Sequence, residues 1–316
     1  MFDVVALGEL LIDFTPYGVS SSGMKLFEQN PGGAPANVLT ALSKMGLRTG
    51  FIGKVGDDIH GLFLKNVLEE QGIDTSSLVL DKEVFTTLAF VELSSTGERN
   101  FSFARKPGAD TCLTVEDVKE DYVSKARVFH FGSLSLTNEP SRSATIASLE
   151  YAKNAGVIIS YDPNYRPLLW DSEQEAMDRM KSVLKYVDIL KVSDEETKLL
   201  TGADDPVEAS KILLDMGISI VAVTLGSEGA IVRTKEGMAQ VPAFESKVVD
   251  TTGAGDSFWG GFLYMLIKSN KLPKDISIGE AKDFTLFANA VASLCVEKRG
   301  AIPAMPSLEE VEERLR

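Results

Sequence analysis

The chain has 316 residues, of which 44% are hydrophobic and 25% charged, as is usual for a globular protein with a sizeable core. Its formal net charge of −14 would repel nucleic acids and anionic membranes, so we expect neither as a partner. No apolar run is long enough to cross a bilayer, and the N-terminal residues carry acids rather than a basic leader. Cys112 and Cys295 lie far apart and form no metal or redox motif. These features predict a cytoplasmic protein.

Short apolar runs alternate along the chain with segments of helical periodicity. The runs predict buried strands at 3–13, 49–56, 127–136, 156–164, 187–194 and 218–226. We expect helices near 35–46, 58–71, 140–155, 173–186, 194–201 and 206–216. This order predicts an α/β fold with a mostly parallel sheet covered by helices on both faces. Ligands bind beyond the carboxyl ends of strands in such sheets, where this chain places Glu9, Asp13, Asp162, Asn164 and Ser193.

Two segments break the alternation. Residues 85–106 alternate apolar and polar side chains on either side of a turn, which predicts a β-hairpin. Residues 15–30 are polar and rich in glycine and serine. Together they predict a small sheet that projects as a lid from one main domain. Because uncovered strand edges seek partners, the hairpin also suggests a homodimer formed through the lid.

Residues 250–263, DTTGAGDSFWGGFL, place Gly253, Ala254 and Gly255 directly before Asp256 and a strongly apolar helix. Glycine costs roughly 1 kcal/mol in a helix interior relative to alanine, so this turn predicts a helix N-terminus. Free N–H groups at such an end bind anions. A carboxylate beside them would weaken simple anion binding, but it suits a general base that acts while a phosphoryl group arrives. The alternative is an ordinary buried helix capped by aspartate. The usual phosphate-loop and dinucleotide motifs are absent from the sequence.

This stretch resembles the C-terminal signature of the ribokinase-like (PfkB) carbohydrate kinases. Residues 30–46, NPGGAPANVLTALSKMG, followed by Gly53 and Gly56, resemble the N-terminal signature of the same family. Leu39 departs from it, since a small residue is usual there, and we expect this to alter helix packing rather than chemistry. The resemblance implies a single ribokinase-like domain over 1–316, with a β lid from about 15–30 and 85–108. It also implies ATP-dependent phosphorylation of a sugar hydroxyl.

The resemblance assigns roles residue by residue. Asp256 would take the proton of the sugar hydroxyl, and the backbone N–H groups of Gly253, Ala254 and Gly255 would hold the phosphoryl group. The sugar would contact Asp13, Gly32, Gly33, Asn37, Arg105 and Arg166. ATP would contact Ser193, Thr224, Gly226, Ser227, Gly229, Gly255 and Asn289. Glu196 would organise Mg²⁺, although Ser193 stands where the family commonly has asparagine. A K⁺ ion would lie among Asp250, Thr252, Cys295, Lys298 and Gly300, mostly through backbone oxygens.

Some of these residues have plainer interpretations. Asp13 suits a solvated acid at a strand end, Asn289 a buried polar group of a helix, and Arg105 or Arg166 an ion pair at the surface or the lid. His60 and His130 form no cluster for a transition metal.

The substrate is predicted from residues 160–170, SYDPNYRPLLW, which resemble fructokinases and, nearly as well, kinases of 2-keto-3-deoxygluconate. Two arginines would suit the carboxylate of the keto acid. The keto-acid kinases, however, tend to carry tyrosines on the lid where this chain has Ala89 and Phe103. Phosphorylation of fructose to fructose 6-phosphate is therefore favoured. The alternatives are a 2-keto-3-deoxygluconate kinase, a ribokinase or nucleoside kinase, or a non-catalytic regulator that binds sugar or nucleotide. A dinucleotide-dependent dehydrogenase is disfavoured because the glycine fingerprint is missing.

Overall fold

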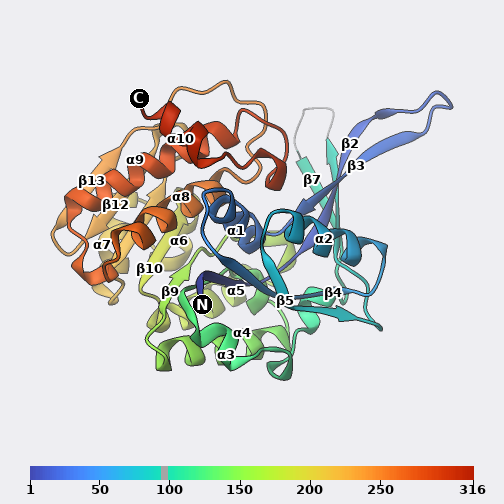
Figure 1. The fold of residues 1–316 in the computed structure, drawn as a ribbon, viewed down its shortest axis with the longest axis horizontal. Helices are drawn as coiled ribbons and strands as arrows, with labels where there is room; N and C mark the ends of the chain where they lie inside the picture. The colour runs from blue at the N-terminus through green and yellow to red at the C-terminus, as the bar shows by residue number, and fades with distance from the viewer. Residues whose placement is uncertain (94–98) are drawn as a thin grey trace.

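The computed structural model describes residues 1–93 and 99–316, and within them a nine-stranded sheet runs through the molecule (Figure 1). The strand order is β13-β12-β11-β10-β9-β8-β1-β4-β5, parallel from β11 to β5 and antiparallel at β12 and β13. The strands are β1 (Phe2–Leu7), β4 (Thr49–Gly56), β5 (Asp74–Asp81), β8 (Ala126–Phe131), β9 (Ile158–Tyr161), β10 (Ile189–Ser193), β11 (Ile220–Thr224), β12 (Ala230–Thr234) and β13 (Gly237–Val241). The predicted α/β class with a mostly parallel sheet is confirmed.

Helices cover both faces of this sheet. One face packs against α1 (Ala34–Lys44), α2 (Ile59–Glu70), α8 (Ala254–Ser269), α9 (Ile278–Cys295) and α10 (Leu308–Arg314). The other packs against α3 (Glu120–Ser124), α4 (Ser141–Asn154), α5 (Glu173–Ser182), α6 (Asp194–Thr201) and α7 (Pro206–Asp215). Side chains alternate along each strand, so Val4 and Ala6 enter the first core while Val5 and Leu7 enter the second. In the described part of the chain, no helix is both long and apolar enough to span a membrane.

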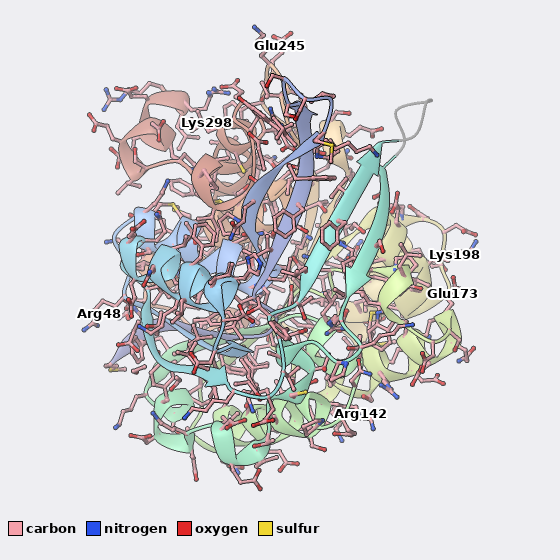
Figure 2. The ribbon with its side chains drawn as sticks, turned by 90° about the vertical axis from the view of Figure 1, so that its right-hand side faces the viewer. Arg48, Arg142, Glu173, Lys198, Glu245 and Lys298 are labelled. Atoms are coloured by element: carbon pink, nitrogen blue, oxygen red, sulfur yellow. The ribbon has the colours of Figure 1, made fainter. Side chains whose placement is uncertain are left out.

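A second sheet of four strands stands apart from the first (Figures 1 and 2). Its order is β3 (Lys25–Gly32), β2 (Leu11–Val19), β6 (Leu88–Leu93) and β7 (Arg99–Ala104). The strands β6 and β7 form the expected hairpin, and its turn lies outside the described residues. The segments expected to make the lid are thus brought together in this small sheet.

The first apolar run was expected to be one strand, and this prediction is wrong. Residues 3–13 are divided between β1 of the main sheet and β2 of the small sheet. Between them the chain turns away at Gly8 and Glu9, where the side chain of Glu9 accepts a hydrogen bond from the N–H of Ala34 at the start of α1 (2.8 Å). The strand–helix pattern did not predict β5, an edge strand with several polar residues, or the β12–β13 hairpin.

Helix α8 lies close to both of its neighbours because it carries two glycines in succession. A Cβ atom on Gly260 would lie 2.7 Å from the Cβ of Ala41 in α1. One on Gly261 would lie 2.8 Å from a methyl group of Val291 in α9. Such separations are too short for real side-chain contacts, so glycine at both positions lets α8 pack directly on α1 and α9. This packing fixes the N-terminal end of α8 at the carboxyl edge of the sheet.

Candidate active site

The N-terminal end of α8 presents unpaired N–H groups. Gly253 caps the helix in the left-handed conformation (φ +78°), and no side chain provides a cap. Within the described residues, the amides of Gly255 and Asp256 donate to no protein acceptor, whereas that of Ala254 bonds to the carbonyl of Thr251. The helix begins at Ala254, which confirms the predicted helix start at this turn. Free amides combined with the positive end of the helix dipole make this a place for an anion.

Asp256 lies beside these amides and is 7% exposed. The side-chain amide of Asn37 donates to one of its carboxylate oxygens (2.8 Å), and that of Asn164 donates to the other (3.2 Å). Burial raises the pKa of Asp256, and the Asn37 hydrogen bond with the charges of Lys191 and Arg166 opposes that rise. Asp256 is therefore oriented by two amides, and its affinity for a proton is greater than that of an exposed aspartate. These are the properties of a general base.

Of the predicted sugar residues, Asn37 contacts Asp256 directly, and the charge of Arg166 lowers the pKa of both Asp256 and Asp13. Asp13 lies on β2, and a Cβ atom on Gly32 would lie 2.5 Å from its carboxylate. Burial raises the pKa of Asp13 to about 6, while the charge of Arg166 lowers it. Asn37 is buried, and its side-chain carbonyl has no hydrogen-bond partner among the described residues. This leaves a carboxylate and an amide oxygen that can both accept hydrogen bonds from hydroxyl groups.

Gly33 joins β3 to α1 and crosses close to the backbone of Glu9. It has φ +131°, and a Cβ atom there would lie 2.3 Å from the backbone oxygen of Glu9. Only glycine fits so close a crossing of two backbones. The carboxylate of Glu9 in turn bonds to the first N–H of α1, and burial raises the pKa of Glu9 to about 7. Glu9 was noted as a strand-end acid but not proposed as part of the site.

The two arginines occupy different positions. Arg166 is exposed, bonds to the backbone oxygen of Tyr165, and lies close enough to influence both Asp13 and Asp256. Arg105 is buried, pairs with Asp110 (2.7 Å) and also donates hydrogen bonds to Thr137 and to the carbonyl of Leu134. All three guanidinium nitrogens of Arg105 therefore have protein partners. The ion-pair alternative describes Arg105 better than the expected substrate contact does.

Most of the residues predicted to bind ATP lie at the ends of β10 and β11. Ser193 caps α6 by accepting a hydrogen bond from the N–H of Glu196, and it is paired in register with Thr224. The turn after β11 includes Gly226, Ser227 and Gly229; Gly226 and Gly229 have positive φ angles of 57° and 93°. Asn289 lies elsewhere, buried in α9, where it donates to the carbonyls of Val241 and Pro242. Asn289 therefore fits the alternative interpretation, a buried polar residue of a helix. Its side-chain amide anchors the last residue of β13 and the proline that follows it.

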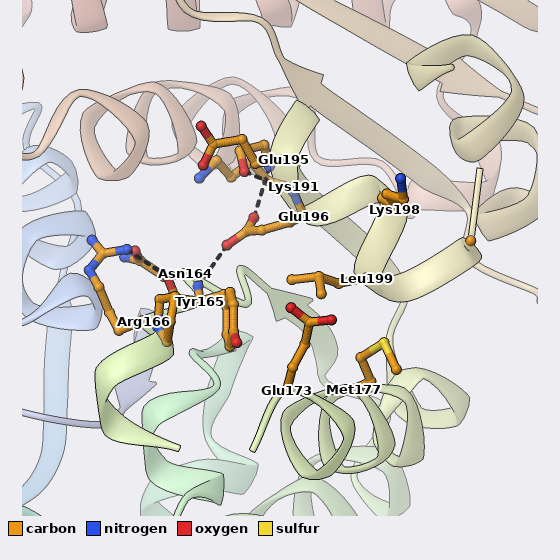
Figure 3. Close-up of a pocket in the computed structure, with 13 residues that line it drawn as sticks. Asn164, Tyr165, Arg166, Glu173, Met177, Lys191, Glu195, Glu196, Lys198 and Leu199 are labelled. Carbon is orange, nitrogen blue, oxygen red and sulfur yellow. Dashed lines mark hydrogen bonds between the residues drawn. The ribbon is translucent and has the colours of Figure 1, made fainter. Parts of the chain in front are cut away.

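A pocket of about 760 Å³ opens beside these strand ends (Figure 3). Lys191, Glu196, Tyr165 and Asn164 lie along one side of it, with Glu173, Met177 and Leu199 along another. The carboxylate of Glu196 accepts hydrogen bonds from the N–H groups of Tyr165 (2.7 Å) and Ser193 (2.8 Å). Among the described residues, no three acidic, cysteine or histidine side chains form a metal cluster. Glu196 alone suits a Mg²⁺ ion that arrives already bound to phosphates.

Most of the predicted K⁺ residues are also brought together. One oxygen of Asp250 accepts hydrogen bonds from the backbone and hydroxyl of Thr252, and the other accepts one from the N–H of Gly300 (3.1 Å). The thiol of Cys295 contacts the backbone oxygen of Thr252 (3.9 Å). The ammonium group of Lys298 instead pairs with Glu310, so only its backbone remains available to the site. These oxygen donors fit a hard cation such as K⁺.

Sequence reasoning missed Lys191 and gave no role to Asp162 or Asn164. Lys191 lies in β10, is 5% exposed and pairs with Asp162 (2.9 Å). A lysine inside an apolar strand is rarely buried without a function or a partner, and that signal was present in the sequence. Asn164 adopts an unusual positive φ of 47°, which directs its amide to Asp256.

Comparison with known proteins agrees with this geometry. The model of the pfkB family carbohydrate kinases matches residues 1–308. Fructokinase-2 of Oryza sativa subsp. japonica is 42% identical over 313 residues, covering 98% of this chain and 93% of the relative. Fructokinase-1 of Zea mays is 41% identical over 312 residues, covering 98% and 96%.

Solved structures agree as well. Fructokinase from Xylella fastidiosa with bound ATP superposes with a TM-score of 0.92 at 32% identity, covering 100% of this chain and 98% of that one. A fructokinase double mutant from Vibrio cholerae O395, bound to fructose, ADP and a potassium ion, gives 0.90 at 33% identity, covering 100% and 99%. Family signatures, fold and site geometry coincide over nearly the whole chain, and the chain belongs to the pfkB family of carbohydrate kinases.

Proposed function

We propose that this protein transfers the γ-phosphoryl group of ATP to the 6-hydroxyl of fructose and releases fructose 6-phosphate and ADP. The observation that carries the proposal is the buried carboxylate of Asp256 directly beside the free amides that begin α8. A regulator that only bound sugar or nucleotide would gain nothing from a base at this point. The relatives named fructokinases match over the whole chain, which supports the same sugar here.

The chemistry follows from the two groups at the end of α8. The hydroxyl of the sugar loses its proton to Asp256 while its oxygen forms a bond to phosphorus and the bond from phosphorus to the ADP oxygen breaks. The amides of Gly255 and Asp256 donate hydrogen bonds to the charge on the phosphoryl oxygens. Asn37 and Asn164 keep the carboxylate aimed at one position. The protein therefore contributes mainly positioning and electrostatic stabilisation.

The sugar is held from the side of β2 and α1. Asp13 and the free carbonyl of Asn37 would accept hydrogen bonds from its hydroxyls, and the backbone at Gly32 and Gly33 leaves room for a close approach. Ala89 faces Phe103 across β6 and β7, and neither side chain can donate a hydrogen bond to a carboxylate. This favours a neutral sugar over 2-keto-3-deoxygluconate.

Two cations accompany the proposed reaction. Mg²⁺ would neutralise charge on the phosphates of ATP, with Glu196 placed to organise it. K⁺ would be held by the residues around Asp250, Thr252 and Gly300, which lie directly before the α8 turn in sequence or in space. The cytoplasm expected from the sequence would supply ATP for the reaction.

We also propose that the small sheet is a lid over the sugar and that two copies associate through it. The far end of its β2–β3 hairpin carries exposed apolar side chains, with Tyr17 (64% exposed) and Val19 (65%) on β2 and Met24 (67%) in the turn before β3. Exposed apolar side chains beside an open strand edge are typical of an association surface.

The test is an assay of ADP release with saturating MgATP across fructose, 2-keto-3-deoxygluconate, ribose and adenosine. We expect kcat/KM for fructose to exceed that for each other acceptor by at least about tenfold, which is roughly 1.4 kcal/mol in transition-state binding. A preference of that size for the keto acid would replace the proposed sugar but leave a kinase. Absence of transfer to every acceptor would refute the proposed activity.

A further inference from the structure

Lys191 is a buried cation that the reaction described above does not use. Burial of an ammonium group is costly unless it is paired. Its partner is Asp162 at the end of the neighbouring strand, with 2.9 and 3.1 Å between the ammonium nitrogen and the two carboxylate oxygens. The two residues are 2% and 5% exposed. An ammonium group has three N–H donors, so this pair uses two and leaves one.

The remaining donor lies next to the amides that begin α8. A Cβ atom placed on Gly255 would be only 2.9 Å from the ammonium nitrogen of Lys191. The amides of Gly255 and Asp256 have no acceptor among the described residues, so three unpaired donors converge from two different elements, β10 and α8. Lys191 also borders the pocket that contains Ser193 and Glu196 (Figure 3). An anion bound at the α8 turn would therefore meet a full positive charge.

The charge of Lys191 is secure in this environment. Burial alone would lower the pKa of its ammonium group, but the carboxylates of Asp162, Glu196 and Asp256 outweigh that effect and raise the pKa. Arg166 is the other cation whose charge reaches Asp256, and it does so from the exposed mouth of the pocket. Lys191 is thus the buried one of the two cations near the reacting carboxylate.

We propose that Lys191 is a catalytic residue that donates its third N–H to the transferring phosphoryl group, and that Asp162 is a positioning residue that holds it there. The proposal rests on the proposed kinase activity. During transfer, negative charge is spread over the outer oxygens of the phosphoryl group, and a fixed charged donor at that point stabilises it without rearrangement. Asp162 accepts the other two N–H groups, which prevents the ammonium from turning toward Asp256 and forming an ion pair with the base.

The first experiment compares Lys191→Met with the double variant Lys191→Met/Asp162→Asn. The single variant leaves the buried carboxylate of Asp162 unpaired. The double variant removes both charges together, so we expect its folded state to be the more stable of the two. In both variants we expect kcat to fall about 10²–10³-fold, as for loss of one transition-state donor, with KM for fructose changed less than about threefold. Recovery of more than about a third of wild-type kcat in the double variant would overturn the proposal, since a purely structural pair would allow it.

A matched control is available in Lys54, which is also a buried lysine on a strand of the same sheet. It pairs with Asp117 (2.7 Å) and Asp81 (3.6 Å), neither of which belongs to the α8 turn. Lys54→Met should lower the melting temperature but leave kcat per folded molecule unchanged. If Lys54→Met lowered kcat as much as the Lys191 variants, a general loss of strand packing would explain both and the proposal would fail.

A second readout does not depend on turnover. Calorimetric titration would measure binding of ADP alone and of ADP with aluminium fluoride, a mimic of the transferring phosphoryl group, to fructose-loaded protein. Relative to wild type, the double variant should bind the mimic at least about tenfold more weakly and ADP nearly as well. Equal binding of the mimic would overturn the role of Lys191. Failure of wild type to phosphorylate fructose or any other acceptor would instead refute the kinase activity, so the two failures are distinguishable.

Discussion

Asp256 depends on its surroundings for both its orientation and its affinity for protons. Two side-chain amides from separate elements fix its oxygens, and burial favours its protonated form. A carboxylate in water would be a weak base toward a sugar hydroxyl. Here burial raises the pKa of Asp256, which would make it a better proton acceptor, while the Asn37 hydrogen bond and the charges of Lys191 and Arg166 oppose that rise.

Replacing Asp256 with asparagine should therefore remove the base without emptying the site. We expect Asp256→Asn to lower kcat about 10²–10⁴-fold, the usual contribution of a positioned general base, and to leave the affinity for ATP nearly unchanged. Asp171→Asn is a suitable control, because Asp171 is an exposed acid outside this cluster. Retention of more than about a tenth of wild-type turnover by Asp256→Asn would exclude the role of base.

The pKa directions predict how activity depends on pH. The pKa of Asp13 is raised to about 6 by burial, and that of Asp256 is raised as well. The proposed reaction needs both ionised, Asp13 to accept hydroxyl hydrogen bonds and Asp256 to accept a proton, so activity is lost as pH falls through the pKa of Asp13 near 6. We expect kcat/KM for fructose to decline below about pH 6, well above the pKa near 3.9 of an exposed aspartate. A profile that stays flat down to about pH 4.5 would show that neither raised pKa controls the reaction.

At the scale of secondary-structure elements, the turn that begins α8 is shaped by its contacts with two other segments. Gly253 lies against Ala301, and a Cβ atom there would be 2.8 Å from the side chain of that residue. Gly255 faces Lys191 of β10. Glycine at 253 allows the left-handed backbone conformation, and glycine at both positions lets Ala301 and Lys191 approach the turn. Without side chains there, the amides at the start of the helix stay accessible.

A side chain at Gly255 should disable this turn. We expect Gly255→Val to abolish turnover, because its side chain would displace the ammonium of Lys191 and block the place of the phosphoryl group. Circular dichroism should show the wild-type fold. The control is Gly279→Ala in α9, where an added Cβ meets only the hydroxyl of Ser277 at 3.9 Å. A folded Gly255→Val protein with near-normal turnover would show that the phosphoryl group does not bind there.

At the scale of the whole molecule, each of the two sheets contributes different residues to the candidate site. The main sheet gathers strand ends from distant parts of the sequence, and helices on both faces hold them in a fixed order. The small sheet holds Asp13 and Gly32 next to each other and leaves the far end of β2 and β3 open to solvent. Figure 2 shows this sheet rising from the body, with the charged side chains of Arg48 and Arg142 on the outer surface far from it.

The open surface of the small sheet predicts a dimer that charge should disrupt. We expect wild type to sediment as a dimer and Tyr17→Lys/Val19→Lys to sediment as a monomer, because burying two ammonium groups at such an interface is unfavourable. Leu272→Lys, which changes a 49% exposed leucine on the main body, should leave the dimer intact. A monomeric wild type at micromolar concentration would contradict the proposed association.

Several features of the fold and site could be predicted from local patterns. The strand–helix alternation predicted the parallel sheet, and period-two alternation predicted the hairpin of the small sheet. The glycine-rich turn before Asp256 predicted the helix end and its free amides. Each of these depends on residues close together in the sequence, where propensity and periodicity act directly.

Local patterns failed where the partner lay far away in the sequence. They could not show that residues 3–13 divide between two sheets, because an apolar run has the same appearance in either. They also could not show that Arg105 pairs with Asp110, or that the side-chain amide of Asn289 donates to backbone carbonyls after β12.

The sequence by itself determined the fold class, the family and the place of the proposed base, Asp256, at the start of α8, since periodicity and short motifs are enough to predict them. Only the tertiary structure decided how that base is held and what faces it. Asn37 reaches Asp256 across 219 residues of sequence, and Lys191 reaches Asp162 across 29. The physical reason is that hydrogen bonds and ion pairs of buried groups depend on distances of a few ångströms in space. Those distances are set when the packing of sheet and helices brings strand ends together, and no local pattern contains them.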